Sequence, residues 1–255
     1  MIITKDFIIL NFPKTGSTYI RTCLKALYKK STTFNRLFHS AIVYEDLHFQ
    51  KIYGNTNENY RDQHAVFSQI PKNQRKKPII SIVRNPFARV VSSYHYAWWK
   101  KNHLYDLDAI EKKYPSYPEL DLLTFAKFLN DAELAPDNLL KPFAKDFGYN
   151  TRLFLIFYAS NPEESAKKLL TGNYKLSDVI EPNITFLKQE QLTQDLVAFI
   201  DSNTKLDSSP INLIKSQNIG IYNTEQEWSQ EFKAYIYKMD KYVFDEFYPN
   251  ETLIK

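Results

Sequence analysis

The stretch Ile8–Tyr28, IILNFPKTGSTYIRTCLKALY, decides the fold prediction. It places an apolar run directly before a lysine, a glycine and three hydroxyl residues, and then continues with apolar residues at helical spacing. A short apolar run that ends at Pro13 is typical of a parallel strand buried on both faces, here over residues 7–12. The stretch therefore predicts a strand, a polar turn and an amphipathic helix with Cys23 on its buried face.

Similar runs elsewhere extend this unit into a sheet. Residues 79–83, IISIV, and residues 184–188, ITFLK, each precede an amphipathic helical pattern, and HAVFS at 64–68 is a candidate fourth strand. Strands that alternate with helices indicate a doubly wound, mainly parallel sheet flanked by helices. We expect one domain over residues 1–255, with a proline- and tyrosine-rich insertion around residues 100–150 beside the sheet.

The composition is that of a packed globular protein, since 44% of the 255 residues are hydrophobic and only 5 are glycines. The formal net charge of +4 gives a mild attraction to anionic ligands, and we expect no nucleic-acid partner. A single cysteine excludes an intrachain disulfide, which fits a reducing compartment or a fold that needs no cross-link. The apolar start is far shorter than the roughly 20 residues of a membrane span. We therefore expect a cytoplasmic protein.

The residues PKTGST at 13–18 suit an anionic ligand. Where a parallel strand meets a helix, backbone N–H groups and the helix dipole together attract a phosphate or sulfate. Gly16 permits a tight turn, and Lys14 adds a positive charge. Hydroxyl donors come from three further side chains: Thr15, Ser17 and Thr18. An alternative is that a hydroxyl group only caps the helix and that Lys14 is solvated.

This loop differs from the ATP-binding loop, which has the order G-x-x-x-x-G-K-[ST]. Ser17 follows Gly16 where that loop has its lysine, and Asn11 stands five positions before Gly16 where it has its first glycine. The pattern therefore lacks two defining residues for ATP.

A second motif, SIVRNPFARVVSSY at 81–94, also joins a strand to a helix. Arg84 supplies a planar fork for bidentate bonds to an anion, and Ser92 adds a hydroxyl donor from the first turns of the next helix. Pro86 is well placed to start that helix. Arg84 and Ser92 can bind one phosphate together. The second motif therefore strengthens the interpretation that the first motif binds an anion.

Together the two motifs resemble those of sulfotransferases that use 3′-phosphoadenosine 5′-phosphosulfate (PAPS), in particular the carbohydrate-sulfotransferase-like branch and its bacterial relatives. FPKTGSTY is similar to the family's loop around the 5′-phosphosulfate, and VRNPFARVVSSY to its 3′-phosphate motif. The resemblance implies a three-layer α/β fold like that of the P-loop nucleotide kinases, with a central, mainly parallel sheet flanked by helices. It also implies a sulfuryl transfer from PAPS to an acceptor hydroxyl or amine on a carbohydrate, with adenosine 3′,5′-bisphosphate (PAP) as product and no metal.

The resemblance also assigns roles to single residues. Lys14 corresponds to the lysine that contacts the bridging oxygen of the sulfate, and Arg84 and Ser92 correspond to the residues that hold the 3′-phosphate. Four residues correspond to those around the 5′-phosphate: Thr15, Gly16, Ser17 and Thr18. Tyr19 falls where many relatives carry an aromatic residue that stacks on adenine, with a position in the core as the alternative. Lys215 is a candidate to close over the nucleotide.

Transfer also requires a base that removes the acceptor's proton, and a histidine or a carboxylate suits that task. His64 is our candidate, because relatives often carry a base histidine in the segment just before the second motif. The alternatives are a histidine that merely satisfies a backbone group, and Glu45 or Asp46 as a carboxylate base.

Two other functions remain as alternatives. A nucleotide kinase or hydrolase would share the sheet but needs magnesium and a lysine after the glycine. A non-catalytic binder of nucleotides or polyanions would keep both phosphate contacts without a base. The acceptor is expected to be a small molecule or a glycan, and the aromatic residues within 94–117 are candidates to stack on it, with helix packing as the alternative.

Overall fold

The structure is a computed structural model, and it describes residues 1–27, 29–30, 43–54, 56, 60–204 and 228–251. The chain divides into two compact units. The first comprises Met1–Gln50, Arg61–Arg84 and Asn183–Tyr222, and the second comprises Lys51–Tyr60, Asn85–Pro182 and Asn223–Lys255, as far as these ranges are described. The expected single domain over residues 1–255 stays a prediction.

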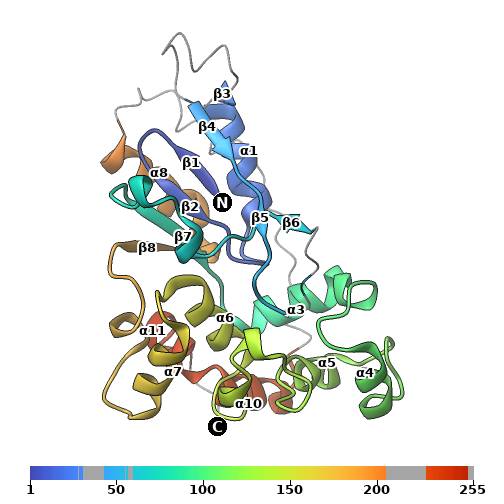
Figure 1. Cartoon of the computed structure of the whole chain (residues 1–255). Coiled ribbons are helices and arrows are strands. Elements are labelled where there is room, and N and C mark those ends of the chain that lie inside the picture. Colours follow the sequence, from blue (N-terminus) through green and yellow to red (C-terminus); the bar gives the residue numbers. More distant parts are fainter. Residues whose placement is uncertain (28, 31–42, 55, 57–59, 205–227, 252–255) are drawn as a thin grey trace. The chain divides into compact units, whose positions relative to one another are not determined.

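The first unit contains a six-stranded sheet with the order β3-β4-β1-β2-β7-β8 (Figure 1). Its strands are β1 Ile2–Thr4, β2 Ile8–Leu10, β3 Lys29–Lys30, β4 Val43–Asp46, β7 Ile79–Val83 and β8 Ile184–Lys188. β7 is parallel to both β2 and β8, and β3 is parallel to β4, whereas β1 is antiparallel to both of its neighbours. A separate antiparallel pair is formed by β5 Phe49–Gln50 and β6 Arg61–Asp62. The predicted α/β sheet with mainly parallel pairing is confirmed.

The predicted strands at 79–83 and 184–188 have the predicted bounds, and the one at 7–12 shortens to Ile8–Leu10. β1 was not predicted, and a tight hairpin joins it to β2. Thr4 Oγ1 accepts hydrogen bonds from the N–H groups of Asp6 at 3.1 Å and Phe7 at 2.8 Å. These bonds close the turn at residues 5–7 between the strands, because they satisfy backbone N–H groups within that turn.

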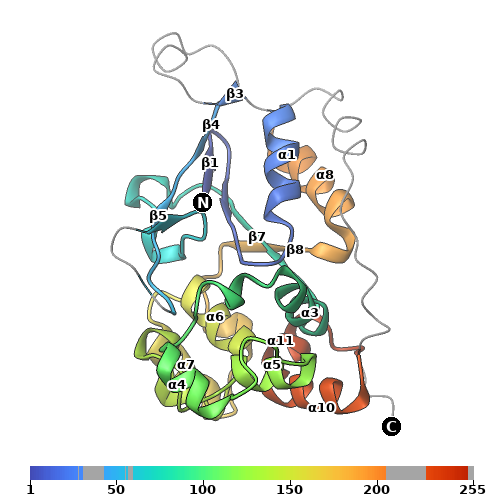
Figure 2. The same ribbon diagram turned by 90° about the vertical axis from the view of Figure 1, so that its right-hand side faces the viewer.

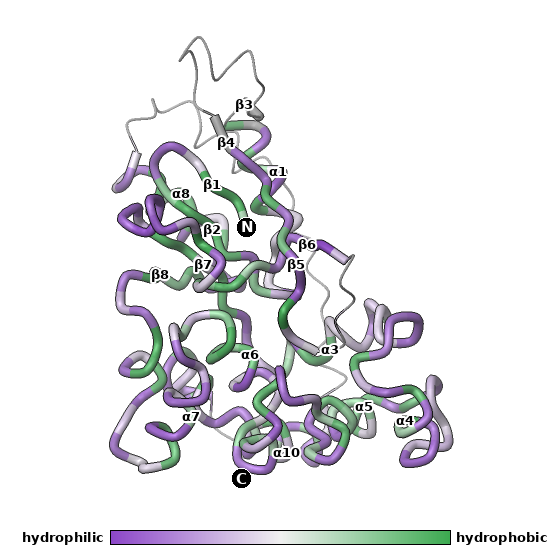
Figure 3. The backbone as a smooth tube through the Cα atoms, viewed as in Figure 1, coloured by the Kyte–Doolittle hydropathy of each residue, from purple (hydrophilic) through white to green (hydrophobic). Residues whose placement is uncertain are grey.

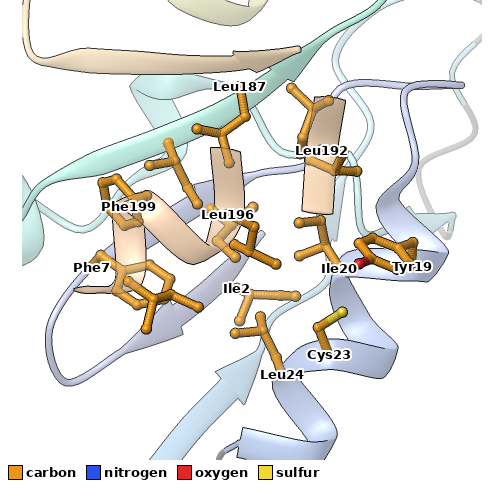
Figure 4. Packing of buried hydrophobic residues seen from close by; sticks show 14 residues of the cluster. Ile2, Phe7, Tyr19, Ile20, Cys23, Leu24, Leu187, Leu192, Leu196 and Phe199 are labelled. Atoms are coloured by element: carbon orange, nitrogen blue, oxygen red, sulfur yellow. The ribbon is translucent and has the colours of Figure 1, made fainter. Parts of the chain in front are cut away.

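Two helices, α1 Ser17–Leu27 and α8 Leu192–Asn203, cover one face of this sheet (Figure 2). Leu192, Leu196, Phe199 and Ile200 form the predicted buried face of α8. These side chains pack with those of α1 and the central strands in one hydrophobic cluster (Figure 4), in which Cys23 is fully buried, as predicted. Hydrophobic residues also predominate along β1 and β2 (Figure 3).

The candidate strand at 64–68 is wrong. Residues Phe67–Gln69 form a 3₁₀ turn, η1, and a second turn, η2 Lys72–Gln74, follows on the side of the sheet opposite α1 and α8 (Figure 2). The N–H of His64 donates to the Asp62 carboxylate at 2.7 Å, and the N–H of Val66 donates to the Gln69 side chain at 3.0 Å. These local bonds occupy groups that a strand ladder would need.

The second unit is helical. Its α-helices are α3 Pro86–Tyr96, α4 Leu107–Lys113, α5 Leu122–Leu129, α6 Tyr149–Tyr158, α7 Pro162–Leu170, α10 Gln230–Met239 and α11 Lys241–Phe247. Its 3₁₀ turns are η3 Trp98–Lys100, η4 Asp137–Leu139, η5 Lys141–Phe143 and η6 Leu176–Asp178, and one further turn, η7 Gln189–Gln191, precedes α8 in the first unit. Residues 100–150 supply the buried side chains Phe125 and Phe128 to this unit, and their status as an insertion stays a prediction. Among the described helices, none is long and apolar enough to cross a membrane.

A buried polar cluster joins α3, α6 and the end of α10. The Asp240 carboxylate accepts hydrogen bonds from the Asn150 side chain at 2.8 Å and from the Thr151 N–H at 2.8 Å. Arg89 of α3 donates to the Asn150 side-chain oxygen. Burial raises the pKa of Asp240, although the bonds from Thr151 oppose that change. The cluster sets the position of α3, which carries Ser92, within the second unit.

Candidate active site

The loop between β2 and α1 contains two residues with left-handed backbone conformation, Lys14 with φ 68° and Gly16 with φ 106°. Turns with such residues gather consecutive N–H groups into an anion-binding concavity. The first intrahelical bond runs from the Ile20 N–H to the Gly16 carbonyl at 3.2 Å. The N–H groups of the first turn of α1 therefore precede the helical ladder, which is the feature by which helix N-termini bind anions in general.

Side chains hold the carbonyl groups of this loop. The hydrogen bonds are Ser81 Oγ to Leu10 O at 2.7 Å, His64 Nδ1 to Asn11 O at 2.7 Å, Thr15 Oγ1 to Phe12 O at 2.9 Å and Arg84 Nη1 to Lys14 O at 3.2 Å. Because each peptide group is planar, fixing a carbonyl also fixes the direction of the N–H in the same peptide. The loop is thus oriented by contacts with residues from β7 and from the segment before η1.

His64 lies beside this loop. A carbonyl oxygen only accepts hydrogen bonds, so the contact with Asn11 assigns the ring proton of the neutral imidazole to Nδ1. Nε2 is then the basic nitrogen, and it accepts a hydrogen bond from the Gln63 side-chain nitrogen at 3.4 Å. Burial lowers the pKa of His64 below its usual value, although the bond to Asn11 and the charge of Asp62 oppose that change. A lowered pKa favours the neutral ring, which is the form that a general base requires.

A family model described as "Sulfotransferase domain" matches residues 4–202. The chain belongs to the sulfotransferase family. This result confirms the family and the enzyme class that the two motifs predicted. Among solved structures, mouse sulfotransferase SULT7A1 complexed with PAP is similar at 14% identity and a TM-score of 0.39, with 86% of this chain and 69% of that chain covered. No curated protein matches the sequence.

Arg84 and Ser92, which were predicted to hold the 3′-phosphate, lie in different units of this sulfotransferase. Arg84 follows β7 directly and is half-buried in the first unit. Ser92 is half-buried on α3 in the second unit, and Asn85 caps that helix by accepting from the Phe87 N–H at 2.9 Å. Pro86 occupies the first helical position, as predicted. The joint contact of Arg84 and Ser92 with one phosphate stays a prediction.

The hydroxyl residues of the first loop differ in exposure. Thr15 is fully buried and its hydroxyl donates to the Phe12 carbonyl, so its hydroxyl supports the loop and its backbone N–H is the group suited to a ligand. Ser17 is half-buried and Thr18 is exposed at the start of α1. Their hydroxyl and N–H groups are therefore at the surface of the first helical turn.

Tyr19 is buried in the hydrophobic core of the first unit (Figure 4). Its hydroxyl is 2.6 Å from Thr193 Oγ1, and burial raises its pKa. This position agrees with the core alternative, and the stacking of Tyr19 on adenine stays a prediction. Lys215 lies outside the described residues, so its predicted contact with the nucleotide stays a prediction as well.

Asp46, one of the two carboxylates considered as the base, has a contact that disfavours this role. Asp46 accepts two hydrogen bonds from Arg21, from Nε at 3.0 Å and from Nη2 at 2.9 Å. Burial opposes ionisation of Asp46, but the bonds and charge of Arg21 outweigh it and lower the pKa of the carboxyl group. A carboxylate held in a bidentate ion pair is a weak base. The geometry therefore supports His64 over Asp46, while Glu45 is half-buried on the same strand.

Sequence reasoning missed Asn11 and Ser81 as residues of the site. Both are fully buried, and each interrupts an apolar run that was interpreted only as a strand. Ser81 carried a signal, because a buried hydroxyl requires a hydrogen bond, and it donates to the Leu10 carbonyl at 2.7 Å. Asn11 takes part through its backbone carbonyl, which any residue carries, so its side chain gave no such signal. Within the described residues, no group of three or more His, Cys, Asp or Glu side chains is arranged to hold a metal ion.

Proposed function

We propose that this sulfotransferase moves a sulfuryl group from PAPS to a hydroxyl or amine of a carbohydrate. The observation that carries the proposal is the position of His64, whose Nδ1 bonds the loop that contains Lys14 and whose Nε2 is basic. A general base beside an anion-binding loop is the arrangement that sulfuryl transfer requires.

The loop would hold the donor through its backbone. The 5′-phosphosulfate would accept hydrogen bonds from N–H groups in the nest around Lys14 and Gly16 and from the first turn of α1. Arg84 and Ser92 would bind the 3′-phosphate, Arg84 as a planar cationic fork and Ser92 through its hydroxyl. Tyr19 and Lys215 are the further proposed nucleotide contacts.

The proposed reaction assigns a task to each of these groups. The acceptor oxygen attacks sulfur while its proton passes to Nε2 of His64, and the bond between sulfur and the bridging oxygen breaks. The electron pair of that bond stays on the bridging oxygen, which leaves as part of PAP. The Lys14 ammonium stabilises the charge that develops there, an electrostatic contribution that amounts to about 3 kcal/mol in comparable sites.

The acceptor class rests on the resemblance to the carbohydrate-sulfotransferase-like branch. Most aromatic residues within 94–117 contribute to packing in the second unit: Trp99 and Tyr105 are buried, and the Tyr94 hydroxyl donates to the Leu120 carbonyl at 3.0 Å. Tyr96 is 64% exposed, so it is the residue of the set best suited to contact a sugar ring. Trp98 is half-buried, and the Lys51 ammonium lies over its ring, 5.2 Å from the centroid. The single, buried cysteine supports the proposed cytoplasmic location.

Titration of the protein with PAP and with ATP tests the donor. We expect PAP to bind more tightly than ATP, and tight binding of ATP with none of PAP would indicate a kinase or hydrolase instead. A screen of saccharide, lipid and phenol acceptors with ³⁵S-labelled PAPS tests the acceptor, and labelled saccharides are the expected products. PAP binding without transfer to any acceptor class would identify a non-catalytic binder.

A further inference from the structure

The Arg84 guanidinium donates to the carbonyl of Lys14 at 3.2 Å, although the two residues are 70 positions apart. Lys14 lies in the loop after β2, and Arg84 directly follows β7. These strands pair in parallel with Leu10 opposite Ser81. Because the carboxyl ends of parallel strands meet at one edge of a sheet, the register brings the guanidinium to the loop.

The conformation of Lys14 gives this bond a specific consequence. A φ of 68° is unfavourable for a residue with a side chain, and such residues persist where their surroundings hold them. The Lys14 carbonyl and the Thr15 N–H belong to one planar peptide group and point in opposite directions. A donor that holds the carbonyl on one side therefore directs the Thr15 N–H to the other side, where the nest binds its anion.

We propose that Arg84 is a positioning residue for the phosphosulfate loop in addition to its contact with the 3′-phosphate; this inference rests on the proposed function. A guanidinium carries five N–H donors on a rigid plane, so one side chain is able to donate hydrogen bonds to a carbonyl and to a phosphate at the same time. Binding of the 3′-phosphate then orders the loop that holds the 5′-phosphosulfate. Arg84 couples the two anion sites of the nucleotide.

Adenosine 5′-monophosphate (AMP) tests this coupling, because it has the 5′-phosphate of PAP and lacks the 3′-phosphate. The variant is Arg84→Met, which keeps an apolar stem of similar length and removes every donor. We expect it to lower AMP affinity about tenfold in calorimetric titrations, as for the loss of a charged hydrogen bond. The comparison variant Ser92→Ala should weaken PAP binding and leave AMP binding unchanged, because its contact is with the 3′-phosphate.

The outcomes separate this inference from the function on which it rests. If Arg84→Met weakens PAP binding but binds AMP as the original protein does, Arg84 contacts only the 3′-phosphate and the inference is wrong. If the original protein binds neither nucleotide, the proposed function itself is wrong. Arg84→Lys keeps a cationic donor and should recover most of the AMP affinity, and it supplies a folded variant if thermal unfolding shows that Arg84→Met is damaged. An Arg84→Lys protein no better than Arg84→Met would contradict the inference.

A second measurement excludes a merely structural role for Arg84. Lys14→Gly and Lys14→Ala both remove the ammonium, but only glycine adopts the left-handed conformation without cost. If Arg84 acts by holding that conformation, Arg84→Met lowers AMP affinity by a smaller factor in the Lys14→Gly background than in the Lys14→Ala background. Equal factors in the two backgrounds would overturn the inference.

Discussion

At the scale of single residues, the two ring nitrogens of His64 have separate tasks. Nδ1 donates to the Asn11 carbonyl and holds the start of the loop, while Nε2 is the proposed proton acceptor. Removal of the whole ring would therefore disturb the loop and the chemistry together. A variant that keeps the Nδ1 bond separates the two tasks.

We expect His64→Asn to bind PAP as the original protein does and to lose turnover by about 10²–10⁴-fold, the usual contribution of a general base. The asparagine amide nitrogen replaces Nδ1 as donor to Asn11, whereas nothing replaces Nε2. Calorimetric titration with PAP and the initial rate of transfer from labelled PAPS give the two readouts. His64→Ala is the matched control, which also loses the bond to the loop. A fully active His64→Asn protein would remove His64 as the base.

In a plot of activity against pH, the loss of activity on the acid side should have its midpoint below the pKa of histidine in model peptides, which is about 6.5. Burial lowers the pKa of His64, and the neutral ring is the active form. Activity is thus complete above the lowered pKa and is lost as the pH falls through it. The profile of kcat/KM for PAPS, at saturating acceptor, measures this value, because it reports groups of the enzyme before the nucleotide binds. A midpoint above the ordinary histidine value would contradict the assignment.

At the scale of elements, Asp240 at the end of α10 holds the first turn of α6 through Asn150 and Thr151, and Asn150 also accepts from Arg89 of α3. The chain at Gly148 passes directly beside this carboxylate, since a Cβ added there would lie 2.5 Å from Asp240 Oδ1. Glycine is required at this position because of the close approach, and its backbone φ of −67° is ordinary. The close packing explains why three helices distant in sequence share one buried cluster.

Gly148→Ala should lower the free energy of unfolding by about 1–3 kcal/mol, the usual cost of overpacking a buried site. The added methyl group has to displace the Asp240 carboxylate from its bonds to α6. Urea denaturation measures the change. Gly172→Ala is the control: Gly172 has a φ of 75° but no atom within 4 Å of an added Cβ, so it reports backbone strain alone. A Gly148→Ala protein at least as stable as the original would show that the carboxylate is free to move.

At the scale of the whole molecule, the mainly parallel sheet is the fold that the sulfotransferase family predicts. The strands β2, β7 and β8 run in parallel, so the loop after β2, which contains Lys14, and Arg84, which directly follows β7, are at one edge of the sheet. Ligands of open α/β sheets bind at that edge. A nucleotide that binds only the folded chain stabilises it through mass action.

PAP at about 100 times its dissociation constant should stabilise the folded protein by about 2.7 kcal/mol and raise Tm accordingly. ATP at the same concentration should raise Tm less, because it lacks a 3′-phosphate. Differential scanning calorimetry with each nucleotide measures the two shifts, and inorganic phosphate serves as control for a general anion effect. A shift with ATP equal to that with PAP would contradict the donor assignment.

Features that depend on neighbours along the chain were predictable. The strands at 79–83 and 184–188, the buried face of α8 and the two anion motifs each lie within a short segment, where hydrophobic periodicity and turn chemistry act. The difference from an ATP-binding loop was also predictable from the order of residues along the chain, because Lys14 stands before Gly16 and not after it. These local patterns were sufficient for the family.

Other features required the folded chain, because they come from residues far apart in sequence. The antiparallel strand β1 forms through pairing with β2 and β4, and the core position of Tyr19 follows from its contact with Thr193, 174 positions away. The tautomer of His64 follows from a carbonyl 53 positions away. Hydrogen bonds of this kind depend on which backbone groups the sheet register brings together, and no local pattern encodes that register.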